Sequence, residues 1–345
     1  MSTSSRSIRL LLIGVGNVGR RVLELLAQKR ALLAERFGLT LVLVGAADSS
    51  GAAVQSAGLD PLEVVRLKMA GLGVADYAGA GRPGASALEL VETARADMLL
   101  AAAPANLQDG QPGLGCIERA LHRSMHVVTA DKAPLVLAYR RLQALAQEHG
   151  VQLRFSATVG GGLPAINIGR RDLAVTRVER LEGILNLTTN YILTRMAEGQ
   201  SYAEALAQAQ AAGHAEADPR LDVEGWDAAS KLVILAHSVL GCPATLADVE
   251  RVGITHLTGE ALREAAAAGK RIKPLASAER EGERYRLRVG PVALPAGHPL
   301  AQLGAEQMGI VYHTDINGQI AAAVVEETPL PTAAAMLRDM VEILG

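Results

Sequence analysis

The sequence predicts an α/β protein, in which a doubly wound parallel sheet is followed by a second, α+β domain. Three observations support this fold class. Short, nearly all-apolar runs alternate with helical patterns up to about residue 150, as in parallel strands that are buried on both faces. A glycine-rich turn joins the first of these runs to the first helical pattern. Beyond residue 150 the alternation changes, and the later apolar runs indicate a mostly antiparallel sheet.

The first apolar run, residues 8–13, leads into the turn IGVGNVG at 13–19 and then into a helical pattern. This is a G-x-G-x-x-G arrangement between a strand and a helix. Its glycines allow a tight turn, and the N-terminus of the helix faces a pyrophosphate. The arrangement indicates a Rossmann-type dinucleotide-binding domain. The candidate cofactor-binding residues of this turn are Gly14, Gly16, Asn17, Val18 and Gly19.

The second apolar run, residues 39–47, ends at Asp48, where the acid that reads the cofactor ribose is expected. A carboxylate at this position would accept hydrogen bonds from the ribose hydroxyls of NAD and repel the additional phosphate of NADP. We therefore favour NAD over NADP as the cofactor. Ser49 and Ser50 follow and are able to bond a phosphate, and Asp48 could instead act as a helix or turn cap.

Two further buried strands are expected at 97–103 and 126–129. Ligands gather at the carboxyl ends of the strands in doubly wound sheets, so Pro104, Thr129 and Lys132 are candidates for the crevice beside the glycine turn. Lys132 could equally be a surface residue that opens the helix predicted over 134–149.

Three other segments of the second half have recognisable patterns. Residues 160–162 are three consecutive glycines, which suit either an ion site made of carbonyl oxygens or close packing. Asn317-Gly318 predicts a hairpin turn between two strands. Residues 332–344 carry an apolar stripe and are expected to form a helix that returns to the first domain.

The stretch GHAEADPRLDVEGWDAASKLVILA, residues 213–236, places five carboxylates ahead of an apolar helix. That helix has to be buried to be stable in water. Asp227 and Lys231, four residues apart, then lie on one face near its first turns. An ammonium beside carboxylates at the edge of a core is suited to proton transfer. The alternative is an ordinary surface ion pair that contributes little.

Composition excludes several classes of partner. The formal net charge is −2, no long run of like charge occurs and aromatic residues make up 3% of the chain, so we expect neither nucleic acid nor an anionic membrane as a partner. No apolar stretch approaches the roughly 20 residues that span a bilayer. The two cysteines, Cys116 and Cys242, lie far apart and outside metal-ligand spacing. We expect reduced thiols and a cytoplasmic protein.

Several separate motifs resemble those of the homoserine dehydrogenase family, and they occur in the family's order. They are IGVGNVG at 13–19, HVVTADKAPL at 126–135, ATVGGGLP at 157–164, GILNLTTNYIL at 183–193, the acidic stretch at 213–236 and PTAAAMLRD at 331–339. The fifth motif is highly specific, and the resemblance covers nearly the whole chain. No ACT-like regulatory segment follows within the 345 residues, so the short form of the family is expected.

The resemblance implies reversible, NAD(P)-dependent reduction of L-aspartate 4-semialdehyde to L-homoserine, on the route to threonine and methionine, by a homodimer. It implies that Lys231 is the acid–base residue at the reacting oxygen, with Asp227 as its neighbour and Lys132 near substrate and nicotinamide. The residues that would bind the small amino-acid substrate are Glu216, Asp222, Thr188 and His214. Gly213 would approach the cofactor. Backbone carbonyls of Val159, Gly161 and Leu163 would offer a sodium site.

The same resemblance implies two domains. The dinucleotide-binding domain would span residues 1–133 and be completed by the helix within 329–345, and a substrate-binding and dimerisation domain would span 134–328.

The chain departs from the family's pattern at five places. Ser156 stands where the family has a glutamate before the sodium loop, Asp131 replaces an asparagine, His214 a tyrosine and Leu187 a glycine, and residues 325–327 replace a glycine-rich turn. These departures leave the cation and the cofactor preference open. They also leave two alternative functions, a dehydrogenase of a related amino-acid semialdehyde or a catalytically idle dinucleotide sensor.

Overall fold

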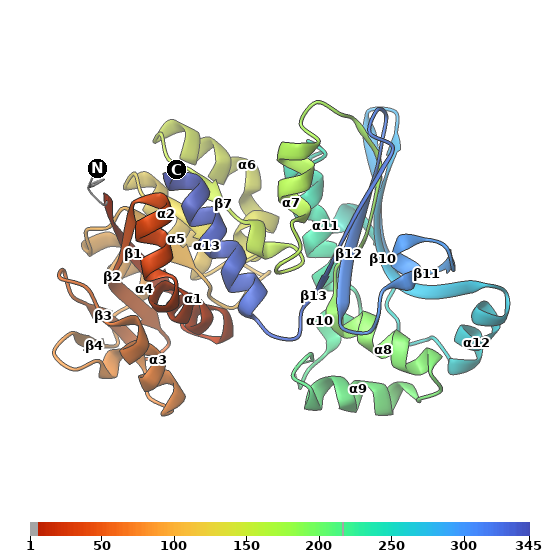
Figure 1. The fold of residues 1–345 in the computed structure, drawn as a ribbon, viewed down its shortest axis with the longest axis horizontal. Helices are drawn as coiled ribbons and strands as arrows, with labels where there is room; N and C mark the ends of the chain where they lie inside the picture. The colour runs from red at the N-terminus through yellow and green to blue at the C-terminus, as the bar shows by residue number, and fades with distance from the viewer. Residues whose placement is uncertain (1–5, 216) are drawn as a thin grey trace. The chain divides into compact units, whose positions relative to one another are not determined.

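A computed structural model describes residues 6–215 and 217–345 (Figure 1). The chain forms two compact units. Unit 1 comprises Met1–Gly162 together with Thr328–Gly345, and unit 2 comprises Leu163–Glu327. The predicted fold class is confirmed, because unit 1 contains a largely parallel sheet with helices and unit 2 contains a second, mostly antiparallel sheet.

Unit 1 is built on a seven-stranded sheet in the order β4-β3-β2-β1-β5-β6-β7. Its strands are β1 (Arg6–Ile13), β2 (Leu39–Asp48), β3 (Gly51–Val54), β4 (Gly81–Pro83), β5 (Met98–Ala101), β6 (His126–Thr129) and β7 (Leu153–Arg154). The neighbouring strands β2, β1, β5, β6 and β7 pair in parallel, and β3 and β4 add two antiparallel pairings at one edge. The central strand β1 is buried, with Leu10, Leu11 and Leu12 inaccessible to solvent, as its apolar run predicts.

Helices cover this sheet. They are α1 (Asn17–Gln28), α2 (Arg30–Phe37), α3 (Pro61–Met69), η1 (Val74–Asp76), α4 (Ala87–Thr93), α5 (Gly113–His122), α6 (Ala133–Glu148), η2 (Ser156–Thr158) and α13 (Leu330–Leu344). The C-terminal helix α13 packs against α1, and its Met336 and Met340 are buried in the same core as Val22. The apolar stripe predicted for residues 332–344 is therefore buried against the core of unit 1.

Unit 1 extends further along the chain than residue 133, the limit expected from the sequence. Helix α6 follows β6, and β7 then pairs in parallel with β6 through Val127 and Leu153. This pairing continues the sheet by one strand, so the first unit ends at Gly162.

Unit 2 contains a six-stranded sheet in the order β13-β12-β8-β10-β11-β9. Its strands are β8 (Val178–Ile184), β9 (Val249–Arg251), β10 (Lys270–Glu281), β11 (Arg284–Pro295), β12 (Gln307–Thr314) and β13 (Gln319–Val325). All neighbouring pairs are antiparallel except β9 and β11. The predicted hairpin joins β12 to β13. Gly318 supplies the left-handed residue, with φ +67°, and the Thr314 amide donates to the Gly318 carbonyl at 2.9 Å.

The helices of unit 2 are α7 (Ala165–Asn167), η3 (Ile168–Asp172), α8 (Leu187–Ala197), α9 (Tyr202–Ala211), α10 (Arg220–Val223), α11 (Trp226–Ser238), η4 (Leu246–Asp248), α12 (Gly259–Ala267) and η5 (Pro299–Gln302). The apolar part of α11 is fully buried, as predicted, and α11 packs against β10 and β11. In the described part of the chain, no helix is long and apolar enough to cross a membrane.

Candidate active site

The glycine turn after β1 has the geometry of a dinucleotide site. Gly14 has φ +85°, and a Cβ there would lie 2.4 Å from the Ala103 amide nitrogen. A Cβ on Gly19 would lie 2.1 Å from the Gly14 carbonyl oxygen, so both glycines permit close packing. A Cβ on Gly16 would meet no described atom within 4 Å. The open space lies where α1 begins, at a helix N-terminus that no described side chain caps.

This arrangement fits the pyrophosphate of a dinucleotide. Backbone amides at the start of α1 are available as donors, and the helix dipole favours a negative group there. Asn17 directs its side-chain oxygen to the Arg20 guanidinium, at 2.7 Å from Nη2, and Val18 packs on the core. Asn17 and Val18 thus belong to the first turn of α1, directly after Gly16.

Asp48 lies at the carboxyl end of β2, but its carboxylate is already saturated. Oδ1 accepts from the Ser50 amide and hydroxyl at 2.9 and 2.5 Å. Oδ2 accepts from Lys68 Nζ at 2.5 Å and from the Val74 amide at 3.2 Å. Burial raises the pKa of this carboxyl, but the hydrogen bonds from Lys68 and Ser50 together lower it below its ordinary value. These hydrogen bonds agree better with Asp48 as a turn cap than with Asp48 as a free acceptor for ribose hydroxyls.

The other cofactor candidates of unit 1 lie at the ends of β5 and β6. Pro104 is exposed in the loop after β5, close to the backbone that packs on Gly14. Thr129 is fully buried, and its hydroxyl accepts from the Asp131 amide at 2.9 Å. Lys132 is the N-cap residue of α6 and is partly exposed. The parallel pairing of β1, β5 and β6 brings these ends to one edge of the sheet.

Asp131 is buried beside Lys132, with 2% of its surface exposed. Its Oδ1 accepts from the Ala133 amide at 3.0 Å. Its Oδ2 has no hydrogen-bond partner among the described residues and faces Gly113 on α5, where a Cβ would lie 2.1 Å from this oxygen. Burial is the largest influence and raises the pKa of Asp131 to about 6, against the smaller opposing effects of the Ala133 amide and Lys132.

This raised pKa predicts a pH-dependent cost. Because the folded-state pKa lies above the ordinary value of 3.8, the stabilising contribution is present below about pH 4 and is lost as the pH rises through about 6. Relative to Asp131→Asn, the wild-type protein should therefore lose about 2 kcal/mol of unfolding free energy between about pH 4 and pH 7. Chemical denaturation of both proteins at several pH values measures this difference. A constant difference across that range would contradict the assignment.

In unit 2, α11 presents the pair that the sequence predicted. Lys231 Nζ lies 2.8 Å from Asp227 Oδ2, and each side chain is only 13% exposed. The ammonium also donates to the Leu185 carbonyl, at the end of β8, at 2.5 Å. This is therefore a largely buried, hydrogen-bonded ion pair, and the surface-pair alternative is wrong. Two of the three Lys231 protons are used by these partners.

Asn186 joins this pair to Asp222. Its amide nitrogen donates to Asp222 Oδ1 at 2.7 Å and to Asp227 Oδ2 at 2.8 Å. Its Oδ1 accepts from the Thr189 amide at 2.8 Å, so the same side chain caps the N-terminus of α8. Asn186 therefore places two carboxylates beside one ammonium, and all its donors point at charged groups.

Asp222, at the end of α10, is in an unusual environment. Burial and the nearby charge of Asp227 raise the pKa of this carboxyl, and the hydrogen bond from Asn186 and the Lys231 charge oppose the shift. One ammonium beside two buried carboxylates leaves an excess of negative charge. The arrangement favours a cationic group of a ligand near Asp222.

A glycine and a stacked pair fix the start of α11. Gly225 has φ +83°, and an added Cβ would lie 3.1 Å from Val289 Cγ1. The Trp226 indole donates to Glu224 Oε2 at 3.1 Å, and the Arg251 guanidinium lies 3.5 Å from the centroid of the Trp226 ring. These contacts orient the first turn, on which Asp227 lies.

Thr188 and His214, two residues that the resemblance implies for substrate binding, are in direct contact. The Thr188 hydroxyl donates to the His214 carbonyl at 2.5 Å. The His214 ring lies 5.3 Å from the Tyr191 ring, and its Nε2 is 3.8 Å from Glu306 Oε1. Gly213 follows the C-cap of α9, with φ +77°, in unit 2. Glu216, the predicted ligand of the substrate amino group, lies outside the described residues.

The glycine-rich loop spans the boundary of the two units. Val159 and Gly161 belong to unit 1, and Leu163 belongs to unit 2, where its carbonyl accepts from the Ala165 amide at 2.8 Å. Ser156 is buried, and its amide donates to Asp339 Oδ2 on α13 at 2.8 Å. Ser156 thus ties η2 to α13 and supplies no carboxylate to a cation.

Sequence reasoning did not single out Asn186 as a site residue. It lies within GILNLTTNYIL at 183–193, a motif that supported only the family resemblance. The signal that could have found it is an asparagine at a helix N-cap that directly follows a buried strand, because such a side chain is aimed at the edge of the core. The spacing of Asp227 and Lys231 predicted only that they share one helix face, and their proposed roles came from the family resemblance.

Comparison with known proteins identifies close relatives. The family model described as homoserine dehydrogenase matches residues 164–341. The homoserine dehydrogenase of Methanocaldococcus jannaschii is 36% identical over 97% of this chain and 98% of its own length. The NAD(+)-dependent homoserine dehydrogenase of Pseudomonas canavaninivorans is 33% identical over 97% and 96%.

Solved structures give the same result. A putative homoserine dehydrogenase from Archaeoglobus fulgidus is 38% identical, with a TM-score of 0.87 over 98% of this chain and 99% of that one. A hyperthermophilic archaeal homoserine dehydrogenase in complex with NADPH is 26% identical, with a TM-score of 0.84 over 98% of both chains. The similarity therefore extends across both units.

Proposed function

The chain belongs to the homoserine dehydrogenase family, and from this membership we infer that it catalyses the reversible, NAD(P)-dependent reduction of L-aspartate 4-semialdehyde to L-homoserine. The reaction belongs to threonine and methionine biosynthesis. The observation that supports it most directly is the cluster in which Asn186 holds Asp222 and Asp227 beside Lys231. This cluster combines a proton donor with a site for a substrate ammonium.

The proposed chemistry assigns the proton to Lys231. A nicotinamide cofactor, which the glycine turn at Gly14, Gly16 and Gly19 would hold, would supply hydride chemistry at the terminal carbon of the substrate. In reduction, the Lys231 ammonium donates a proton to the oxygen that becomes the alcohol, and in oxidation the amine accepts it. Asp227 and the Leu185 carbonyl hold two Nζ protons, which directs the third towards the substrate oxygen. Lys132 is proposed to lie near substrate and nicotinamide.

Substrate orientation is proposed to depend on the acidic residues. Asp222 has excess negative charge around it, and it would hold the substrate ammonium by a charge-assisted hydrogen bond, together with Glu216. Thr188 and His214, which are hydrogen-bonded to each other, would border the same site. Binding of a cation at Asp222 offsets the cost of burying two carboxylates beside one ammonium.

The experiment is an initial-rate assay of L-homoserine oxidation at alkaline pH, with NAD and NADP in parallel. Reduced cofactor should accumulate with either or both. If homoserine is a poor substrate beside close hydroxy amino acids, the related-dehydrogenase alternative holds. If the protein binds dinucleotide and turns over neither, the sensor alternative holds.

The saturation of Asp48 bears on cofactor preference, for which the sequence favoured NAD. Because the Lys68 ammonium neutralises this carboxylate at 2.5 Å, repulsion of the 2′-phosphate of NADP is offset, and we propose that both cofactors are used. Lys68→Gln uncovers the charge of Asp48. It should lower kcat/KM for NADP by about five-fold, with NAD changed less than two-fold. Parallel kinetics of Lys68→Gln and of the exposed control Lys29→Gln test this, and equal losses for both cofactors would refute it.

Two further proposals concern assembly and the cation. We propose a cytoplasmic homodimer, for which light scattering of the purified protein gives the mass. A sodium ion at the carbonyls of Val159, Gly161 and Leu163 would lack a carboxylate, since Ser156 stands before the loop. Comparison of turnover in sodium chloride and in choline chloride measures whether the enzyme depends on that ion.

A further inference from the structure

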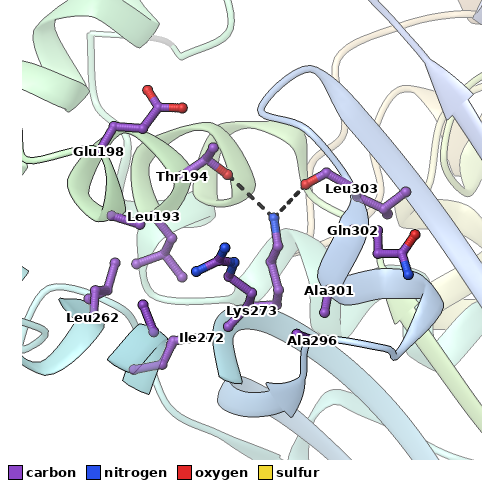
Figure 2. A pocket seen from close by; sticks show the side chains of 13 residues that line it. Leu193, Thr194, Glu198, Leu262, Ile272, Lys273, Ala296, Ala301, Gln302 and Leu303 are labelled. Atoms are coloured by element: carbon purple, nitrogen blue, oxygen red, sulfur yellow. Dashed lines mark hydrogen bonds between the residues drawn. The ribbon is translucent and has the colours of Figure 1, made fainter. Parts of the chain in front are cut away.

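A cavity of about 450 Å³ lies within unit 2, between α8, α12, β10 and η5 (Figure 2). Its volume is within the range of small-molecule sites. Asp222, Asp227 and Lys231 do not line it, so it is distinct from the candidate active site. The walls combine apolar side chains, among them Leu193, Leu262 and Ile272, with a few polar groups.

Lys273 on β10 is the buried polar group of this cavity, with 4% of its surface exposed. Its ammonium donates to the Leu303 carbonyl at 2.7 Å, to Asn190 Oδ1 at 3.0 Å and to Thr194 Oγ1 at 3.4 Å. All three partners are uncharged, so the positive charge is solvated but not neutralised. Burial, with a smaller contribution from the charge of Arg271, lowers the pKa of Lys273 to about 8.

The other charges around the cavity add to this imbalance. Arg271 also lines it, and neither Arg271 nor Lys273 forms an ion pair with any described carboxylate. The one acidic residue of the lining, Glu198, is instead paired with Arg195 at 2.8 Å. The buried ammonium of Lys273 and the exposed guanidinium of Arg271 therefore line the cavity without an ion-pair partner among the described residues, which favours an anionic ligand.

The geometry around Lys273 leaves room for such a ligand. Figure 2 shows the ammonium between Thr194 and Leu303, with Thr194 on the cavity wall. The bond to Thr194 is the longest of the three, at 3.4 Å. A carboxylate oxygen that took over this proton would make a shorter, charge-assisted hydrogen bond, and the Thr194 hydroxyl would then be able to donate to the same carboxylate.

We propose that this cavity binds a small aliphatic carboxylate, whose anionic end is held by Lys273, Arg271 and Thr194 and whose hydrocarbon part packs on Leu193, Leu262 and Ile272. Burial of the hydrocarbon part against the apolar side chains contributes binding energy, and the two cations, Lys273 and Arg271, favour a ligand with a negative charge. The proposal does not depend on the catalytic assignment, because the two sites share no lining residue.

The test is isothermal titration of the whole protein with valerate and with valeramide, which has the same shape and no charge. Valerate should bind, and valeramide should bind at least about ten-fold more weakly. Ala266→Phe, which fills the cavity from α12, should abolish valerate binding, and Arg271→Gln should weaken it about ten-fold. Arg263→Gln serves as the matched control for the loss of a cation. Arg263 is exposed on α12 and does not line the cavity.

The thermal midpoint of each variant is measured alongside, and an unchanged midpoint assigns a loss of binding to the cavity. L-norvaline is titrated as a third ligand. Binding tighter than valerate identifies an α-amino acid as the source of the carboxylate, and equal or weaker binding identifies a plain organic acid. Equal affinity for valerate and valeramide, no binding of either, or valerate binding that survives in Ala266→Phe, would overturn the proposal.

Discussion

Replacement of Lys231 by methionine is expected to lower kcat for homoserine oxidation by about 10²–10⁴-fold, the usual contribution of a positioned general acid–base group. Methionine keeps most of the length and apolar character of the buried side chain, so the fold of α11 should persist. The ammonium that donates to Asp227 and to the Leu185 carbonyl is lost, and with it the proton for the substrate oxygen. Steady-state kinetics with saturating cofactor and homoserine measure the effect.

The control for this variant is Lys270→Met, at an exposed lysine at the start of β10. It should retain wild-type kcat. Cofactor affinity, measured by fluorescence of the reduced nicotinamide, should be nearly unchanged in Lys231→Met, because Lys231 belongs to unit 2 and the glycine turn to unit 1. A Lys231→Met enzyme with more than about a tenth of wild-type kcat would remove Lys231 from the proposed chemistry.

Asn186→Asp is expected to have the second largest effect. The substitution removes both donors to Asp222 and Asp227 and adds a third carboxylate to the cluster. We expect a loss of about 3 kcal/mol, since two hydrogen bonds to charged groups are replaced by repulsion. For a unit of this size, that loss lowers the thermal midpoint by about 6–12 °C. Differential scanning calorimetry measures it, with the exposed hairpin variant Asn317→Asp as the matched control.

Asn186 is proposed as a positioning residue, and its kinetics separate that role from a structural one. Below the new thermal midpoint, Asn186→Asp should still bind cofactor but should show a changed pH profile of kcat, because its carboxylate alters the field at Lys231. An unchanged profile in a folded, destabilised variant would mean that Asn186 only caps α8.

Local patterns predicted the elements of the fold. The apolar run before IGVGNVG became the buried central strand β1, and Asn317-Gly318 formed the hairpin between β12 and β13. The four-residue spacing of Asp227 and Lys231 likewise predicted that they lie on one face of a helix, because this spacing is a local property. Each of these features depends on residues that are close in sequence, so periodicity and turn chemistry are sufficient to find them.

Contacts between distant segments were not predictable in this way. Asn186 meets Asp222 and Asp227 only because α8, α10 and α11 converge at the end of β8. Asp48 has the expected position at the end of β2. However, the Lys68 ammonium and the Val74 amide, from later segments of the chain, donate hydrogen bonds to its carboxylate. The limit of unit 1 was missed because the pairing of β7 with β6 places a strand after a long helix in the first sheet.

Chemical rescue of Lys231→Ala tests the central claim, that the Lys231 amine moves the proton, most directly. Homoserine oxidation by this variant is measured with increasing concentrations of methylamine and of ammonium at fixed ionic strength. The proposed mechanism predicts a rate that rises with the concentration of the free amine and depends on its basicity, and no such rise in the wild-type enzyme. A variant that no amine restores, or one that is active without any, would contradict it.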